Sequence, residues 1–412
     1  MLEPARRLAA VQTPVIPTLG RLIRETPGCL NLGQGMVSWG PPADVRAALS
    51  AVAQEAERQG DGQLVADLDP YGPMAGDPAL LEAIGDHLRH RHGLDPEASS
   101  VIVTAGSNMA FQALAQVLCD PGDEVLLPVP YYFNHAMAVQ LAGGVPKPVL
   151  AGVQLDPALL EAAIGPRTRA LVTISPNNPS GAVLSRQTLA AINALCARRG
   201  LLHIHDEAYA AFHHGEQPAW SPGSAPGAAA HTVTLQSLSK SHGMAGWRVG
   251  WMVVPPSLAP DLAKVQDTSL ICPPRLSQRA AAVALKGDWD WMQAPMTALR
   301  QRRQQWLERF DQPGRPWRLL APADGAFYGL LELDAPITAD LAMERLVREH
   351  GVAVVSGGSF GLEGCCLRVS YGMLQGEAFR DAIERLASGL EALACDTSQG
   401  PSSSDHPPAA RP

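Results

Sequence analysis

A single lysine, Lys240, stands among small hydroxyl and glycine residues in the segment Ser237–Arg248, and Arg248 follows it eight positions later. Enzymes use lysine as a covalent catalyst where an amine must form an imine with a carbonyl group. A cofactor with both an aldehyde and a phosphate would need such a lysine, with Ser237, Ser239 and Arg248 as phosphate donors. Pyridoxal phosphate carries both groups, so the segment predicts a site for it.

Other polar residues follow short apolar runs of the kind that form buried strands. Asp206 comes directly after the run 201–205, where a carboxylate can keep the pyridine nitrogen of the cofactor protonated. The segment 104–110 joins another run to a helix, and its small residues let backbone amides approach a phosphate. Asn178 lies in a turn with two prolines and a glycine, from which its amide can donate to the ring 3-oxygen.

The elements that would position these residues alternate between strands and helices from about Asp44 to Leu285. Their runs are apolar throughout, which is typical of a parallel sheet covered on both faces, so we expect a doubly wound α/β domain. Ligands bind beyond the carboxyl ends of the strands in such sheets. The expected strands are 101–104, 124–127, 170–174, 201–205 and 232–235.

The pattern divides the chain into four segments. Residues 44–290 form the large domain; residues 291–395, with a long charged helix near 296–310 and strands at 327–333 and 367–370, form a small α+β domain. Residues 1–43 are expected to pack with the small domain. Residues 396–412 are rich in Ser, Pro and Ala, without apolar periodicity, and are expected to be a disordered tail.

Composition excludes several classes of protein. The 412 residues are 46% hydrophobic and 17% charged, as in globular proteins. The net charge of −8 offers no basic footprint for nucleic acid, and no window holds the ~18 apolar residues of a membrane span. Seven cysteines, an odd number without Cys-x-x-Cys spacing, predict reduced thiols and a cytoplasmic location. We assign no metal ligands.

Taken together, the motifs resemble the class I/II aminotransferases of fold type I, the aspartate aminotransferase superfamily. The resemblance covers roughly Asn31 to Leu390, and the motifs stand in the order of that family. It implies a large, mostly parallel sheet domain with a smaller α+β domain. It also implies pyridoxal phosphate as cofactor and amino acids with 2-oxo acids as substrates.

The resemblance implies a role for each motif residue around the cofactor. Lys240 would form the imine and move the proton between the substrate Cα and C4′ of the cofactor. Asp206 would hold the pyridine nitrogen, and Tyr209 and Asn178 would bond the ring 3-oxygen. The remaining cofactor residues implied are Gly106, Ser107, Asn108, Tyr132, Ser237, Ser239 and Arg248.

Two details of this ring site stay open in the sequence. Tyr132 matches the aromatic residue that stacks on the ring, but it is the middle one of three consecutive aromatic residues. His135 either supports Asp206 or is a satisfied core histidine.

Further matches concern the substrate and a second subunit. Arg368 would clamp the α-carboxylate, since guanidinium binds carboxylate through two donors. Gly35 would touch the same carboxylate through its backbone, and Trp39 would line a side-chain pocket. Tyr71 matches a tyrosine that reaches the phosphate of a neighbouring subunit, which implies a homodimer with shared active sites.

The sequence departs from the pattern of the dicarboxylate-specific members. No arginine precedes Pro273 and Pro274, whereas Arg275 follows them. The segment 36–42 is similar to the kynurenine, methionine and aromatic branch. We therefore expect a neutral or aromatic L-amino acid as donor, a 2-oxo acid as acceptor and ping-pong kinetics.

Two other functions share part of this pattern. A carbon–sulfur β-lyase, or another α,β-eliminating enzyme, would keep every residue named above. Such enzymes form the same carbanion at the substrate Cα, and the shape of the pocket decides where its electrons go. A regulator that senses the cofactor would need a DNA-binding module, and neither the residues before Asn31 nor the acidic charge favour one. The donor and acceptor themselves stay open.

Overall fold

The computed structural model describes residues 4–60, 62–65, 68–215 and 219–396. Its largest sheet has seven strands, and β8 is the strand that runs antiparallel to both of its neighbours. The other pairings are parallel, so the expected α/β fold is confirmed. In spatial order the strands are β2 (Ser100–Thr104), β8 (Gly250–Val254), β7 (Thr232–Ser237), β6 (Leu202–Asp206), β5 (Thr168–Ile174), β3 (Glu124–Pro128) and β4 (Val145–Val149).

Helices cover both faces of this sheet because successive strand residues point to opposite sides and both sets are apolar. Val125 and Val172 belong to the core beneath one group of helices, whereas their neighbours Leu126 and Leu171 belong to the core on the other side. The first group is α4 (Ser107–Leu118), α5 (Phe133–Leu141) and α9 (Ala259–Leu270). The opposite face carries α3 (Pro78–His87), α6 (Pro157–Ala163), α7 (Arg186–Arg199) and α10 (Arg275–Lys286).

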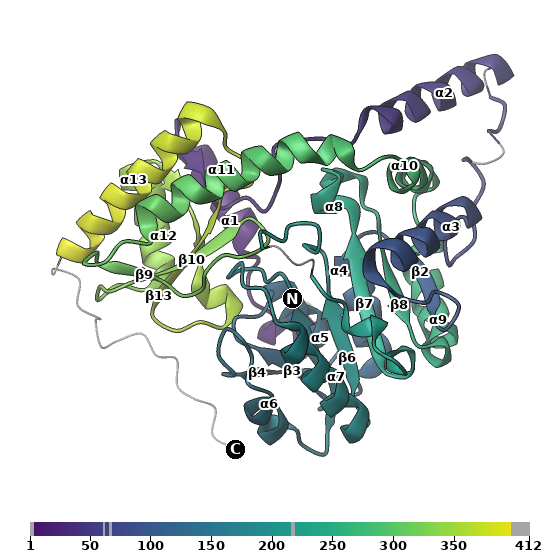
Figure 1. Cartoon of the computed structure of the whole chain (residues 1–412), viewed down its shortest axis with the longest axis horizontal. Helices are drawn as coiled ribbons and strands as arrows, with labels where there is room; N and C mark the ends of the chain where they lie inside the picture. Colours follow the sequence, from purple (N-terminus) through teal and green to yellow (C-terminus); the bar gives the residue numbers. More distant parts are fainter. Residues whose placement is uncertain (1–3, 61, 66–67, 216–218, 397–412) are drawn as a thin grey trace.

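A second, antiparallel sheet lies apart from the first (Figure 1). Its order is β12 (Val355–Ser356), β13 (Cys365–Ser370), β10 (Tyr328–Leu333) and β9 (Trp317–Leu319). The helices α12 (Ala339–His350) and α13 (Gly376–Cys395) pack beside it, and the long α11 (Gln293–Phe310) runs above both groups of elements (Figure 1).

The N-terminal segment returns to this second group. Strand β1 (Leu30–Asn31) pairs in parallel with β11 (Val352–Ala353), and α1 (Val15–Glu25) shares a buried cluster with α12. α2 (Ala43–Gln59) instead projects outward beside α10 (Figure 1). The division of the chain at residues 43, 290 and 395 stays a prediction, and the expected tail falls almost wholly outside the described residues.

Among the described residues, no helix combines the length and apolarity needed to cross a bilayer. Within the same part of the chain, no group of three or more His, Cys, Asp or Glu side chains is arranged to hold a metal ion.

Candidate active site

A cavity of about 300 Å³ opens between the carboxyl edge of the large sheet and the second sheet. The last residues of β5, β6 and β7 (Ile174, Asp206 and Ser237) all line it, as expected for a doubly wound sheet. The residues expected from the sequence that line it are Gly35, Ser107, Asn108, Tyr132, Asn178, Asp206, Tyr209, Ser237, Ser239, Lys240, Arg248 and Arg368.

Lys240 lies on α8 (Leu238–Ser241), a single turn that begins where β7 ends. The hydroxyl of Ser237 accepts from the amide of Ser239 at 3.1 Å and so fixes the start of this turn. The Lys240 Nζ donates to the Gly35 carbonyl at 2.5 Å. Burial, and then the charges of Arg368 and Arg248, lower the pKa of Lys240 to about 8. The side chain therefore holds a substantial neutral fraction at mildly alkaline pH.

Asp206 is buried and bonded on both carboxylate oxygens. Its Oδ1 accepts from the amide of Ala208 at 2.9 Å, and its Oδ2 lies 3.2 Å from His135 Nε2. The His135 ring stacks on Phe111, with centroids 4.0 Å apart. His135 therefore contacts Asp206 directly, and these two partners fix the direction in which the carboxylate faces the cavity.

Two tyrosines meet at the floor of the cavity. The hydroxyl oxygens of Tyr209 and Tyr328 are 2.8 Å apart, and both side chains are buried. Burial, together with the neighbouring Tyr328, raises the pKa of Tyr209 well above its ordinary value, so this phenol stays protonated and can donate.

Arg368 on β13 is the most buried of the cationic side chains that line the cavity, with 2% of its surface exposed. Its Nη1 donates to Asn178 Oδ1 at 2.9 Å and its Nη2 to the Gly33 carbonyl at 2.6 Å. Its Nε has no partner within the described chain. A buried guanidinium with a free donor suits an incoming anionic group.

Arg248 stands at the other end of the cavity, beside the N-terminus of α4. Its Nη2 donates to the Ala105 carbonyl at 2.9 Å, and its backbone adopts a left-handed conformation with φ of 55°. A Cβ on Gly106 would lie 2.5 Å from the Arg248 guanidinium, so only glycine allows this approach. Guanidinium, helix N-terminus and the hydroxyls of Ser107 and Ser239 together make an anion site.

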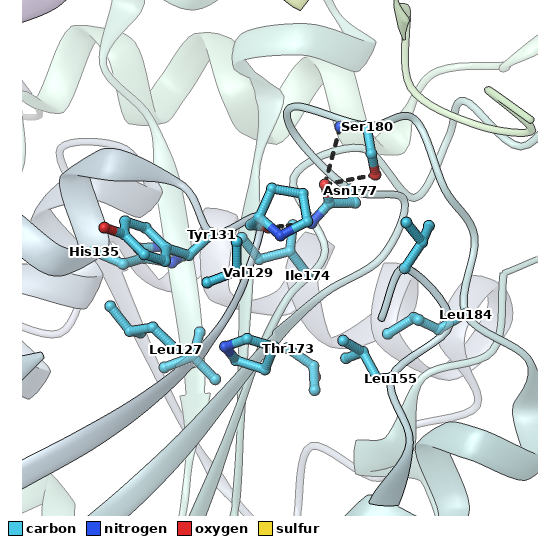
Figure 2. Close-up of a pocket in the computed structure, with 14 residues that line it drawn as sticks. Leu127, Val129, Tyr131, His135, Leu155, Thr173, Ile174, Asn177, Ser180 and Leu184 are labelled. Carbon is cyan, nitrogen blue, oxygen red and sulfur yellow. Dashed lines mark hydrogen bonds between the residues drawn. The ribbon is translucent and has the colours of Figure 1, made fainter. Parts of the chain in front are cut away.

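Neighbouring residues in the same motifs point elsewhere. Figure 2 shows Tyr131 and Asn177 in a separate small pocket, where Asn177 Oδ1 accepts from the amide and hydroxyl of Ser180 at 3.0 and 2.8 Å. Tyr132 and Asn178 line the larger cavity instead. The structure thus places neighbouring residues of each motif in different pockets, a distinction that the sequence alone did not make.

Three of the expected residues, Gly106, Trp39 and Tyr71, do not line this cavity within the described chain, although Gly106 packs against Arg248, which does. The Trp39 Nε1 donates to the Ser241 carbonyl at 3.1 Å, and its ring packs on Phe212. Tyr71 is 79% exposed. Arg275, near Tyr71 in space, lies 3.3 Å from Asp77 and lines a different cavity.

Sequence reasoning missed Tyr328, which lines the cavity and touches both Tyr209 and Arg368. It also missed Ile16, Met36 and Phe133 at the same cavity. Phe133 and Met36 lie in segments that the sequence singled out, but nothing in the spacing distinguishes these apolar side chains from core residues.

Comparisons with known proteins agree with this geometry. The model of the family described as aminotransferase class I and II matches residues 27–386. The chain is 37% identical to arginine–pyruvate transaminase AruH of Pseudomonas aeruginosa over 79% of this chain and 83% of the relative. It is 33% identical to aromatic aminotransferase ISS1 of Arabidopsis thaliana over 94% and 96% of the two chains.

Solved structures agree as well. A double mutant of Thermus thermophilus aspartate aminotransferase superposes with a TM-score of 0.83 at 32% identity, covering 94% of this chain and all of the other. The aromatic aminotransferase of Pyrococcus horikoshii gives a TM-score of 0.80 at 30% identity, with 91% and 99% covered.

Proposed function

We propose, because this chain belongs to the class I and II aminotransferases, that its cavity binds pyridoxal phosphate and uses a neutral or aromatic L-amino acid as donor. The observation that carries the proposal is the buried amine of Lys240, with its pKa lowered to about 8, in one cavity with Asp206 and Arg248. Lysine, carboxylate and guanidinium are the three charged groups that this cofactor requires.

The residues present fit the cofactor at both ends. Arg248, Ser107, Ser237 and Ser239 would hold the phosphate, since they offer charge-assisted and hydroxyl donors at a helix N-terminus. Asp206, held by His135, would hold the pyridine nitrogen in its protonated form. When bound, the cofactor supplies an electron sink for negative charge at the substrate Cα.

Other side chains would orient the ring. Tyr132, the residue directly before α5, lines the cavity and would stack on the ring. Tyr209 and the Asn178 amide would donate to the ring 3-oxygen, because both line the cavity and both carry a hydrogen to donate.

Lys240 would act twice in the reaction. Its neutral amine would hold the cofactor through the aldehyde and, once the substrate amine has displaced it, would take the proton from the substrate Cα. A base works best when its pKa lies near the working pH, which the lowered pKa of about 8 provides. Release of the same proton from Lys240 would complete its part in one half-reaction of a ping-pong cycle.

Arg368 would bind the α-carboxylate. Gly33, which it contacts now, and Gly35, which Lys240 contacts, belong to one N-terminal segment: the Gly33 carbonyl accepts from Arg368 and the Gly35 carbonyl accepts from Lys240. Substrate would therefore engage the two cations that this segment now contacts.

The cationic side chains lining the described cavity are Lys240, Arg248 and Arg368, and each already has a role. No further cation is thus assigned to a second substrate carboxylate, while Ile16, Met36 and Phe133 offer apolar contacts. This supports a neutral or aromatic donor. The relatives themselves carry names that range from arginine to aromatic and aspartate substrates.

We also propose that the enzyme is a cytoplasmic homodimer. Tyr71 exposes 79% of its surface, which suits a side chain that completes a neighbouring subunit's phosphate site.

A panel of single amino acids mixed with the cofactor-loaded protein, without oxo acid, tests the function. Transamination predicts one oxo acid released per site, with a stoichiometric change in the cofactor spectrum. Continuous release of pyruvate and ammonia from a cysteine conjugate would instead support a β-lyase. The amino acid that gives the fastest single turnover identifies the donor.

A further inference from the structure

Tyr328 opens β10 and is fully buried, yet it lines the active-site cavity. It stands where three parts of the site meet, because it touches Tyr209, Arg368 and the backbone at Gly35. None of the roles described above includes it.

Among the residues that the structure describes, the hydroxyl of Tyr328 has one polar partner, the Tyr209 hydroxyl at 2.8 Å. Burial raises the pKa of both phenols, so each keeps its single proton. If Tyr209 gives its proton to the ring 3-oxygen, the hydrogen between the two hydroxyls has to come from Tyr328. Tyr328 then fixes the direction in which Tyr209 donates.

The same hydroxyl also shapes the N-terminal segment. A Cβ on Gly35 would lie 2.7 Å from the Tyr328 Oη, closer than real Cβ contacts allow. The hydroxyl therefore occupies the space that a side chain at position 35 would take. The backbone carbonyl of Gly35 accepts a hydrogen bond from Lys240, so Tyr328 packs against the same residue that contacts the lysine.

The ring of Tyr328 serves a second purpose. The Arg368 Cζ lies 4.6 Å from its centroid, with Phe360 at 5.4 Å. β10 and β13 pair so that Leu330 stands opposite Arg368, which places Tyr328 two residues away, on the same face as a diagonal neighbour. An aromatic face stabilises a buried guanidinium, more strongly where water is excluded.

We infer that Tyr328 is a positioning residue that orients Tyr209 toward the cofactor through its hydroxyl and holds the carboxylate clamp Arg368 through its ring. The inference rests on the proposed function, because it takes Tyr209 as the donor to the ring 3-oxygen and Arg368 as the clamp.

Two substitutions separate the two contributions. Tyr328→Phe removes the hydroxyl and keeps the ring under Arg368, whereas Tyr328→Leu removes both. Tyr371→Phe is the matched control, since Tyr371 is equally buried and its hydroxyl has no partner within the described chain. Thermal unfolding of each holoenzyme confirms that the variants fold.

The first readout is the pH midpoint of the absorbance change of bound pyridoxal phosphate. Donation to the ring 3-oxygen stabilises the deprotonated form of the bound cofactor, so its loss favours the protonated form. We expect Tyr328→Phe to raise the midpoint by roughly half to one pH unit, the size of one neutral hydrogen bond. Tyr371→Phe leaves the midpoint unchanged.

The second readout is the dissociation constant of 3-phenylpropionate, which carries a carboxylate and an aromatic group but no amine. We expect Tyr328→Leu to weaken its binding about tenfold, whereas Tyr328→Phe keeps it within about twofold of the wild type. If the wild type does not bind this probe, the donor class is wrong, and the KM of the donor found in the amino-acid panel replaces the dissociation constant.

An unchanged midpoint in Tyr328→Phe, in an enzyme whose wild type binds the cofactor and transaminates, overturns the inference. A wild type that does not bind pyridoxal phosphate overturns the proposed function instead. If Tyr328→Leu does not fold, Tyr328→Phe still decides the role of the hydroxyl. Equal probe affinity in a folded Tyr328→Leu variant overturns the role of the ring.

Discussion

At the scale of single residues, Lys240 shows how the fold prepares an ordinary side chain for chemistry. The amine lies at the end of a buried turn with two arginines nearby, and these surroundings lower its pKa from 10.5 to about 8. The same surroundings cost stability while the amine is charged. Perturbed pKa values of this kind are typical of functional sites.

This lowered pKa predicts the pH dependence of cofactor capture by the protein without cofactor. The neutral amine is the nucleophile, so the capture rate should rise with pH through about 8 and level off above it. Stopped-flow absorbance measures the rate, with N-α-acetyl-lysine as reference, for which the rise continues to about pH 10.4. A midpoint near that of the reference would contradict the assigned environment.

Removal of the amine gives a second prediction. We expect Lys240→Ala to lower turnover by at least about 10³-fold, because the covalent link and the base are lost together. Arg248 is retained, so the variant should still bind the cofactor without a covalent bond. Lys264→Ala is the control, as Lys264 is an exposed lysine paired with Asp261. Near-normal activity in Lys240→Ala would disprove the mechanism.

Arg368→Lys tests the carboxylate clamp. Lysine keeps the charge but not the planar fork that reaches Asn178 and Gly33 together, so we expect kcat/KM to fall about 10- to 100-fold. The exposed Arg318 is the control, since Arg318→Lys changes only a surface ion pair with Glu332. Equal kinetics for the two variants would remove Arg368 from the substrate site.

At the scale of elements, the turn after β5 joins the two sheets through Gly181. The Gly181 carbonyl accepts from the Gly325 amide at 2.8 Å, and a Cβ at position 181 would clash with the Tyr328 carbonyl. The backbone φ of +70° disfavours a side chain as well. This contact sets the distance between Asn178 on the turn and Arg368 on β13.

Gly181→Ala should therefore destabilise the protein by about 2 kcal/mol or more, since backbone strain and a backbone clash add. Gly200→Ala is the matched control: its φ is +67°, but nothing lies within 4 Å of the added Cβ, so only about 1 kcal/mol is lost. Denaturant unfolding compares the two. Equal losses would show that Gly181 does not join the sheets as described.

At the scale of the whole molecule, the cavity draws on segments from nearly the full length of the chain. Ile16, Arg248 and Arg368 line the same space. Among the described residues, two expected cofactor residues do not line this cavity: Gly106, which packs against Arg248, and Tyr71. Tyr71 is instead 79% exposed. The proposed dimer accounts for its position.

Mixed dimers test this sharing of sites. Lys240→Ala and Tyr71→Ala subunits, each weakly active alone, should regain activity when refolded together. One site per mixed dimer then combines an intact Lys240 with an intact Tyr71 from the other subunit. Failure to regain activity, with mixed dimers confirmed by mass, would place Tyr71 in its own subunit's site or outside both.

The chemistry of the site could be predicted from the sequence because its main residues lie close together in short segments of the chain. Lys240, Ser237 and Ser239 share one turn, and Asp206 and Ser107 sit at junctions between strands and helices that apolar runs reveal. A doubly wound sheet brings such junctions to one edge whatever the details of packing. The expected strands of the large sheet were confirmed to within one or two residues. Two further strands of that sheet were not expected: β8 and the edge strand β4, which contains two prolines.

Only the tertiary structure decided the contacts between distant segments. Arg368 meets Gly33 across 335 positions, and Tyr209 meets Tyr328 across 119. No periodicity or local spacing encodes such a meeting, because it depends on how two sheets and an N-terminal segment pack together. For the same reason the sequence overlooked Tyr328 and expected Trp39 at a pocket, whereas packing turns Trp39 toward Ser241 and Phe212. The sequence determined which chemistry is available, and packing determined which side chains orient it.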